Sequence, residues 1–286
     1  MERHLPLALM LILLCACTGP ARKAGTSAPA EGADTLTLWA EEDTLAAVEA
    51  EEDIPLPTRA DELFDDFIFN YAQDPALQRS RTVFPLPYYN GDTPEKIEKA
   101  DWKHDYLFAQ QACYTLLFDN EDDLDLVGDT SLCSVQVEFF LLQTRQVRKW
   151  YFQKKDGMWM LEAINLRQVE ASESDQETFL DFYARFATDS IYQMAHIRDP
   201  LPYITLDPDD EFSILETSID AGQWSAFSPA LPTDGLTNIN YGQRNDDLSR
   251  EKIMKVNGIG NGYSNVFYFK RRHGQWELYK FEDTSI

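Results

Sequence analysis

An internal repeat constrains the fold of this chain more than any other feature. The segment from Phe64 to Asp74 aligns without gaps to the segment from Phe179 to Asp189, and each leads to a Pro-Leu-Pro-Tyr sequence, at 85–88 and at 200–203. Near the ends of the halves, the residues at 151–152, 157, 159 and 161 match those at 268–269, 274, 276 and 278. Because one register holds across both ends, we expect two homologous domains, 59–169 and 175–286, joined by the polar segment 170–174.

Each half begins with the pattern of an amphipathic helix. Apolar residues recur at helical spacing on one face, at positions 64, 67, 68 and 71 and at positions 179, 182, 183 and 186. We expect Asp61 and Asp175 to be the N-caps of these helices. A further helix is predicted over residues 93–102, with Pro94 in its first turn.

The later part of each half has the two-residue period of β-strands. The predicted strands are 133–142, 147–155, 158–167, 253–257, 264–272 and 275–281. The segment 212–224 could be helix or strand. Helices followed by a run of strands predict an α+β fold, in which N-terminal helices pack on a curved antiparallel sheet. The repeat therefore predicts two such cone-like units, each with a core of its own.

The N-terminus resembles that of bacterial lipoproteins. The apolar run from Leu5 to Leu14 is shorter than the roughly 20 residues that a spanning helix needs. It leads to Leu14-Cys15-Ala16-Cys17, which resembles a lipobox. This resemblance implies a signal peptide over 1–16 and a lipid attached to Cys17. The acidic, Ala- and Thr-rich segment 17–58 is expected to be a disordered tether.

The net charge of -24 excludes some partners. A surface of this sign repels phosphate backbones, so we expect no binding of nucleic acid. Membrane contact is expected through the lipid anchor alone. Thr18 stands where some bacteria place the Asp that retains lipoproteins at the inner membrane, so we expect an outer-membrane location in the cell envelope.

Besides the lipidated Cys17, two cysteines, Cys113 and Cys133, remain after processing. An oxidising envelope would permit a disulfide between them, and two buried thiols are the alternative. The sequence leaves both open.

The sequence has no recognisable catalytic or metal-binding motif. The histidines at 104, 196 and 273 are far apart, and the acidic run 119–125 lacks the Gly and Glu of a calcium loop. The glycine-rich segment 258–262 lies between predicted strands, where a bend explains it. We therefore expect no metal and no cofactor.

One loop of the second half combines amide, phenol and guanidinium groups. Its polar residues are Asn238, Asn240, Tyr241, Gln243 and Arg244. They suit contact with a sugar, a peptide or a protein, but such side chains also satisfy the backbone of their own loop. The sequence leaves this tentative binding loop open as well.

The order of helices and strands, with the lipobox, the acidic tether and the repeated Pro-Leu-Pro-Tyr sequence, resembles a family of bacterial lipoproteins with two tandem nuclear transport factor 2-like (cystatin-like) domains. The resemblance covers the chain from about residue 59. It implies a fold but no activity, because this fold serves enzymes and binding proteins alike. We expect a noncatalytic binding or scaffold protein for an unknown small ligand or envelope protein. The alternative is an isomerase, dehydratase or hydrolase that uses Asp and Tyr in a cone pocket.

Overall fold

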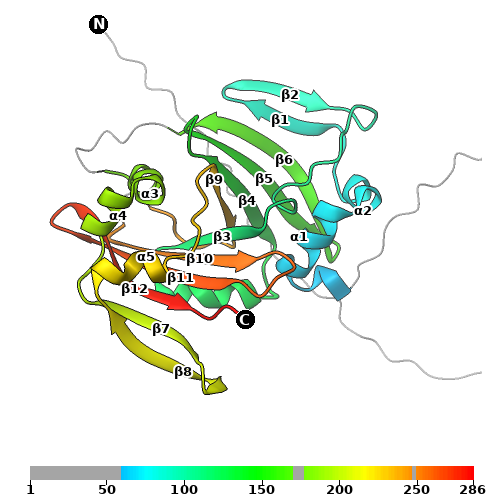
Figure 1. Cartoon of the computed structure of the whole chain (residues 1–286). Coiled ribbons are helices and arrows are strands. Elements are labelled where there is room, and N and C mark those ends of the chain that lie inside the picture. Colours follow the sequence, from blue (N-terminus) through cyan, green and yellow to red (C-terminus); the bar gives the residue numbers. More distant parts are fainter. Residues whose placement is uncertain (1–58, 170–176, 247–248) are drawn as a thin grey trace, which may run out of the picture. The chain divides into compact units, whose positions relative to one another are not determined.

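The two halves of the chain fold into a similar order of helices and strands. The computed structural model describes residues 59–169, 177–246 and 249–286, which all belong to one compact unit (Figure 1). The elements of the first half are η1 (Arg59–Asp61), α1 (Phe64–Gln73), α2 (Pro75–Ser80), β1 (Leu86–Asn90), β2 (Thr93–Ile97), β3 (Cys113–Phe118), η2 (Glu121–Gly128), β4 (Ser134–Leu141), β5 (Gln146–Lys155) and β6 (Met158–Gln168). Those of the second half are α3 (Phe179–Thr188), α4 (Ser190–Ala195), β7 (Leu201–Asp207), β8 (Asp210–Ile219), η3 (Ala221–Gln223), α5 (Trp224–Phe227), β9 (Gly235–Asn240), β10 (Glu251–Gly258), β11 (Ser264–Arg272) and β12 (Gln275–Asp283). The predictions for residues 1–58, including Cys17, and for Asp175 lie outside the described residues.

The first helix of each half forms as the sequence predicts. All four apolar residues of the predicted face are buried, both in α1 and in α3. Asp61 does not cap α1, so that prediction is wrong. Its carboxylate is buried and forms an ion pair with Arg81, because a buried charge needs a partner. The last residues of the aligned segments, Asp74 and Asp189, instead cap α2 and α4 by accepting hydrogen bonds from backbone N–H groups of the first turn.

The segment 93–102 is not the predicted helix. It begins with the short strand β2, which pairs with β1 through a tight turn at Gly91, where φ is +58°. This positive φ suits glycine and closes a two-residue hairpin loop. Pro94 is tolerated because β2 is an edge strand, where a missing N–H costs no pairing partner. The segment 212–224, for which the sequence left helix and strand open, contains most of β8, then η3 and the first residue of α5.

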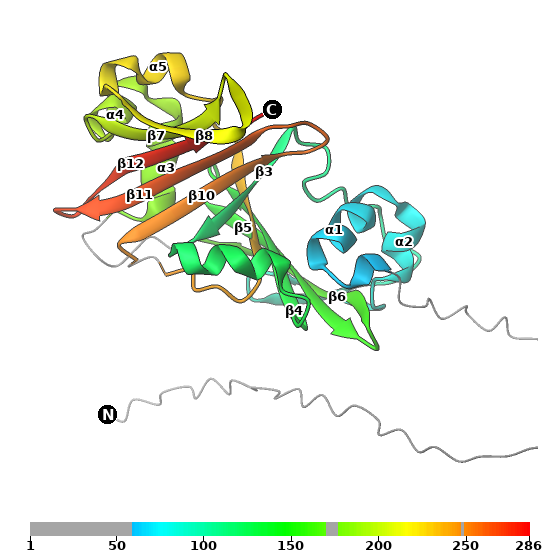
Figure 2. The ribbon, with the colours of Figure 1, turned by 90° about the horizontal axis from the view of Figure 1, so that it is seen from below.

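The strands form two six-stranded sheets that exchange one strand between the halves. Sheet A has the order β2-β1-β6-β5-β4-β9, and sheet B has the order β3-β10-β11-β12-β7-β8. The third strand of each half thus joins the sheet of the other half. β9 pairs with β4, and β3 pairs with β10, beside which it lies in Figure 2. Both sheets are mixed, because β1 and β7 join β6 and β12 in parallel while the other pairs are antiparallel.

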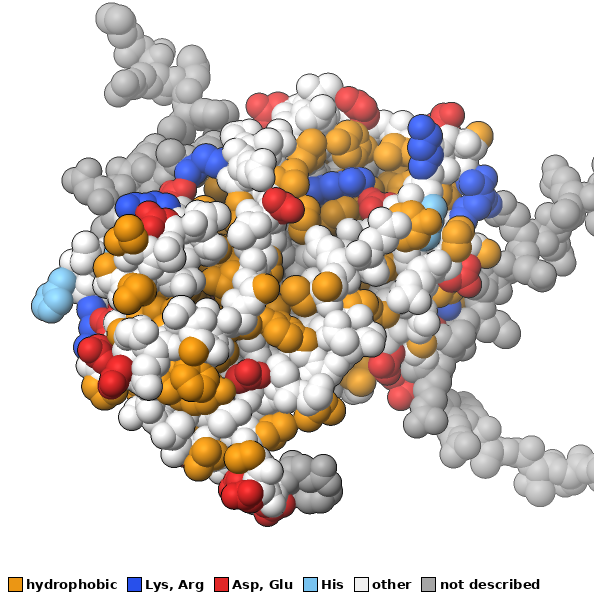
Figure 3. Space-filling model, in the orientation of Figure 1, with side chains coloured by type: hydrophobic (Ala, Val, Ile, Leu, Met, Phe, Trp, Pro, Cys, Tyr) orange, Lys and Arg blue, Asp and Glu red, His pale blue; other side chains and the backbone are white. Residues whose placement is uncertain are grey.

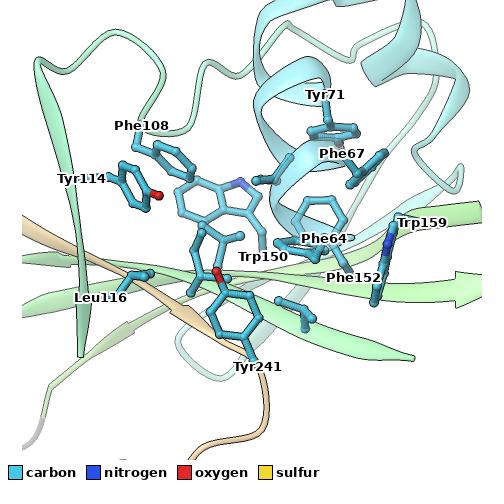
Figure 4. Close-up of a cluster of buried hydrophobic side chains, with 14 of the residues drawn as sticks. Phe64, Phe67, Tyr71, Phe108, Tyr114, Leu116, Trp150, Phe152, Trp159 and Tyr241 are labelled. Carbon is cyan, nitrogen blue, oxygen red and sulfur yellow. The ribbon is translucent and has the colours of Figure 1, made fainter. Parts of the chain in front are cut away.

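The exchange also mixes side chains of the two halves within each of the two core clusters. One buried cluster contains Phe64, Phe152 and Trp159 of the first half with Tyr241 and Ile253 of the second (Figure 4). The other cluster is built mostly by the second half but takes Leu117, Phe140 and Val147 from the first. Two core clusters therefore form, as expected, but neither is built from one half alone, because each sheet takes a strand from the opposite half. The boundaries 59–169 and 175–286 of the repeat itself stay a prediction.

The interiors between helix and sheet are filled by aromatic side chains. The ring of Phe64 lies 5.3 Å from that of Phe152 and 5.0 Å from that of Trp159, between centroids. In the second half, Phe179 lies 5.3 Å from both Phe269 and Trp276. These edge-on contacts show that the aromatic residues at the repeated positions pack in the core. None of the described helices has the length and apolar character that a membrane crossing requires.

Candidate functional site

The tentative binding loop forms part of the junction between the sheets. Asn238 and Asn240 belong to β9, and Asn238, Tyr241 and Gln243 are buried. The Gln243 amide nitrogen donates to the carbonyls of Leu117 and Ile239, at 3.3 and 2.9 Å, and its oxygen accepts from the backbone N–H of Tyr241. Only Arg244 is exposed. Most of these groups therefore satisfy backbone and neighbouring side chains, which was the alternative that the sequence left open.

Asn238 connects both sheets. Its side-chain oxygen accepts a hydrogen bond of 2.9 Å from the backbone N–H of Leu117 on β3. Its side-chain nitrogen donates, at 2.9 Å, to Oε2 of Glu138 on β4. The other carboxylate oxygen of Glu138 forms an ion pair with the ammonium of Lys149 on β5. A continuous polar row thus runs from the strand junction onto the face of sheet A.

This face of sheet A lines a cavity of about 790 Å³, which we call the sheet cavity. Register places Glu138 opposite Lys149, and Lys149 opposite Asn165, so that the three side chains form one row across β4, β5 and β6. The complete lining is Gly91, Asp92, Glu138, Phe140, Val147, Lys149, Asn165, Arg167, Gln168, Val169, Leu180, Asn240 and Asn245. The volume lies in the range of small-molecule sites.

Two polar groups of the sheet cavity lack a partner. The exposed guanidinium of Arg167 forms no hydrogen bond or ion pair with any other group of residues 59–169, 177–246 or 249–286. The side-chain oxygen of Asn165 is buried and has no hydrogen-bond donor there either. A guanidinium presents donors in a planar fork that matches carboxylate or phosphate. The cavity therefore offers a cationic donor beside a free acceptor, and Phe140, Val147 and Leu180 form an apolar wall.

Both oxygens of the buried carboxylate in the sheet cavity have partners. One oxygen of Glu138 is held by Lys149 and the other by Asn238. The side chain of Glu138 is only 2% exposed, so both partners are needed to compensate its charge. This arrangement orients Lys149 and the floor of the cavity.

An Asp–Tyr pair does exist, but it lies away from the sheet cavity. The Tyr241 hydroxyl donates a hydrogen bond to Asp65 on α1. Burial raises the pKa of Asp65 and, together with the nearby Asp65 charge, raises the pKa of Tyr241. Figure 4 shows Tyr241 among the aromatic side chains of the first core cluster. The pair joins the two halves, and neither residue lines the sheet cavity.

The two remaining cysteines lie on different sheets. Cys113 begins β3 of sheet B, is half-buried and carries a free thiol. Cys133 directly precedes β4 of sheet A and is exposed. No disulfide joins the two residues in this structure, and the alternative of two buried thiols does not fit Cys133. Cys113 lines a second, mainly apolar hollow of about 370 Å³ with the segment 230–235.

The histidines and acidic residues do not assemble into a metal site. Within the ranges that the structure describes, no group of three or more His, Cys, Asp and Glu side chains could hold a metal ion. Asp119, which begins the acidic run, forms a buried ion pair with Lys252 on β10. His273 lies in the β11–β12 turn, where φ is +50°.

The sequence analysis missed the residues of the sheet cavity. Glu138, Asn165 and Arg167 alternate with apolar residues along predicted strands, and Lys149 stands between Arg148 and Trp150. That pattern is also typical of a solvent-facing side of a sheet. The only available signal was that opposite charges and amides occupy neighbouring strands of one face.

Comparison with known proteins gives a family and a fold. The family model described as "Domain of unknown function (DUF4348)" matches residues 42–283. The chain is also similar to an NTF2-like protein from Bacteroides fragilis NCTC 9343 with a crystal structure, at 62% identity and a TM-score of 0.77. The alignment covers 81% of this chain and 100% of that chain. No curated protein matches. These findings confirm the predicted α+β fold, which is NTF2-like.

Proposed function

Because the chain belongs to the family described as Domain of unknown function (DUF4348) and has an NTF2-like fold, we propose that it is a noncatalytic binding module for a small polar ligand with an anionic group. The ligand occupies the sheet cavity. The observation that carries this proposal is the guanidinium of Arg167, which has no partner among the described residues, at the edge of a cavity where the side-chain oxygen of Asn165 has no donor among them either. Arg167 binds the anionic group, and Asn165 accepts from a hydroxyl or amide of the ligand.

The two partners of Glu138 support binding over catalysis. A general base needs a free carboxylate oxygen within reach of the substrate. Both oxygens of Glu138 already accept from Lys149 and Asn238. The sheet cavity therefore supplies charge and hydrogen bonds of fixed geometry, which is what recognition of a polar ligand requires.

A matched pair of probes tests the proposal. Glucuronate and glucose share a ring of hydroxyls, but only glucuronate has a carboxylate. We expect glucuronate to bind the wild-type protein measurably more tightly than glucose in isothermal titration calorimetry. Arg167→Gln should reduce the affinity for glucuronate about tenfold, since charged hydrogen bonds contribute roughly 1.5–3 kcal/mol in binding. Arg79→Gln removes another exposed arginine, on α2, and is expected to change nothing.

Three results would reject this function. One is equal affinity for the acid and the neutral sugar. Another is unchanged affinity in Arg167→Gln, and the third is the absence of glucuronate binding together with no effect of inorganic phosphate on the melting temperature.

We also propose that the module is exported and anchored to the outer membrane by lipid on Cys17, with the two halves as tandem NTF2-like units on an acidic tether. The lipobox and the repeat support this proposal. The chain expressed in a lipoprotein-processing host should partition into the detergent phase, and Cys17→Ser should move it to the aqueous phase. Cys15→Ser is the matched control. Aqueous partitioning of the wild-type chain would contradict the anchor.

A further inference from the structure

Two six-stranded sheets have four edge strands, and three of these edges are closed or protected. The edge strands are β2 and β9 of sheet A and β3 and β8 of sheet B. β3 and β9 satisfy each other: the Thr115 N–H donates to Oγ1 of Thr237, and the Leu117 N–H donates to Asn238. Edge strands with unpaired backbone groups are templates for further pairing unless they are blocked. The two outer edges, β2 and β8, lack such a partner strand.

The two outer edge strands, β2 and β8, differ in length and in sequence. β2 is five residues long and carries Pro94, Glu95 and Lys96, which are the features that block pairing. Its counterpart β8 is ten residues long and has no proline or lysine. At its centre Ile214 is 62% exposed and Leu215 is 41% exposed. As neighbours on a strand, these two residues point to opposite faces of the sheet, so both sides of this edge are apolar.

Acidic side chains surround this apolar centre. Asp207, Asp209 and Asp210 lie at the turn between β7 and β8, and Glu216 follows Leu215 on the strand. Figure 1 shows the β7–β8 hairpin extending away from the rest of the fold, and Figure 3 shows acidic and apolar side chains together at its tip. A strand that pairs with β8 would place its side chains beside both groups. The complementary strand has aliphatic residues at its centre and basic residues next to them.

We propose that β8 is a docking edge for an extended, basic segment of a partner protein, which adds a seventh strand to sheet B. The open N–H and C=O groups of β8 provide the backbone pairing. Ile214 and Leu215 provide apolar contact on the two faces, and Glu216 with the aspartates of the turn selects for Lys or Arg. This surface is separate from the sheet cavity, which lies on sheet A.

A short peptide serves as the probe. The peptide Lys-Val-Thr-Ile-Thr-Val-Lys, blocked at both ends, has the proposed chemistry, and its variant with Glu in place of both Lys has the opposite charge. With the full chain, we expect the basic peptide to bind about tenfold more tightly than the acidic one in fluorescence anisotropy, and less tightly as salt is added. Hydrogen exchange of the amides of 210–219 should slow when the basic peptide is bound.

Substitutions separate the edge from the rest of the surface. The double variant Ile214→Thr/Leu215→Thr keeps the strand propensity but removes the apolar contact, and it should weaken peptide binding about tenfold. Ile191→Thr removes an isoleucine of α4 that is 82% exposed and should leave binding unchanged. Equal binding of both peptides, or no slowing of exchange in β8, would overturn the proposal. Self-association of the wild type that the double variant abolishes would also overturn it, because the edge would then bind a second copy of the chain.

Discussion

At the scale of single residues, the buried ion pair between Asp61 and Arg81 fixes how the first half begins. Both side chains are 2% exposed, and Nη1 of Arg81 lies 3.0 Å from Oδ1 of Asp61. Asp61 also accepts from the backbone N–H of Trp159 on β6, at 3.3 Å. The pair therefore holds together η1, the end of α2 and strand β6.

Removing one partner of this pair should be costly. Asp61→Ala leaves the Arg81 charge buried, so we expect a loss of about 3–5 kcal/mol in the free energy of unfolding, measured by urea denaturation. The double variant Asp61→Leu/Arg81→Met removes both charges and should recover much of this loss. Lys155→Ala breaks a pair with the lysine side chain 50% exposed and should cost less than about 1 kcal/mol. Equal losses for Asp61→Ala and Lys155→Ala would contradict the argument.

Asp65 should make stability depend on pH. Burial raises its pKa above the ordinary value of 3.8, so the folded protein keeps this proton at pH values where the unfolded chain has released it. The contribution of Asp65 to stability therefore falls as the pH rises from about 4 through the raised pKa. Asp65→Asn keeps an acceptor for the Tyr241 hydroxyl and removes the titration. Its free energy of unfolding, relative to wild type, should be higher at about pH 7 than at about pH 4. Asp101→Asn, at an exposed position away from Asp65, is the control, and a pH-independent difference for Asp65→Asn would count against the effect.

At the scale of elements, the exchange of β3 and β9 depends on a few buried polar groups. Asn238 is fully buried and joins Leu117 on β3 to Glu138 on β4. Asn238→Ala leaves a backbone N–H and part of a buried carboxylate without partners, so we expect a loss of about 2–3 kcal/mol in the free energy of unfolding. Asn240→Ala, two residues further along β9, removes a half-exposed amide and should cost less than about 1 kcal/mol. Similar losses for both variants would mean that Asn238 does not connect the sheets.

The helices and strands were predictable because their periods are local. Phe64, Phe67 and Tyr71 define the buried face of α1 from the sequence alone, and most long strands end within about two residues of their predicted bounds. The strand exchange was not predictable. The segments Cys113–Phe118 and Gly235–Asn240 are buried along most of their length, so their side-chain pattern does not specify which sheet they join. Pro94 predicted a helix start, but the tight turn at Gly91 and the edge position favoured a strand.

The sheet cavity was not predictable for a related reason. Its row of Glu138, Lys149 and Asn165 exists only because register places three strands side by side. Each residue alone has the pattern of an ordinary polar position on a sheet. For the loop at 238–244, the composition suggested an exposed binding site. In the structure Asn238, Tyr241 and Gln243 are instead buried, because the strand exchange places them between the two sheets.

At the scale of the whole molecule, the exchange makes the halves dependent on each other. Each half lacks one strand of the sheet that it mainly builds, and each core contains side chains from both halves. We therefore expect one cooperative transition in urea and in calorimetry. With a protease site inserted between residues 169 and 177, the cleaved chain should still elute as one species and unfold in one step. Residues 59–169 expressed alone should fail to fold, because Phe139 and Phe140 on β4 lose their pairing with β9. Fragments that separate after cleavage, each with its own transition, would show instead that the exchanged strands contribute little and that the repeat behaves as two independent domains.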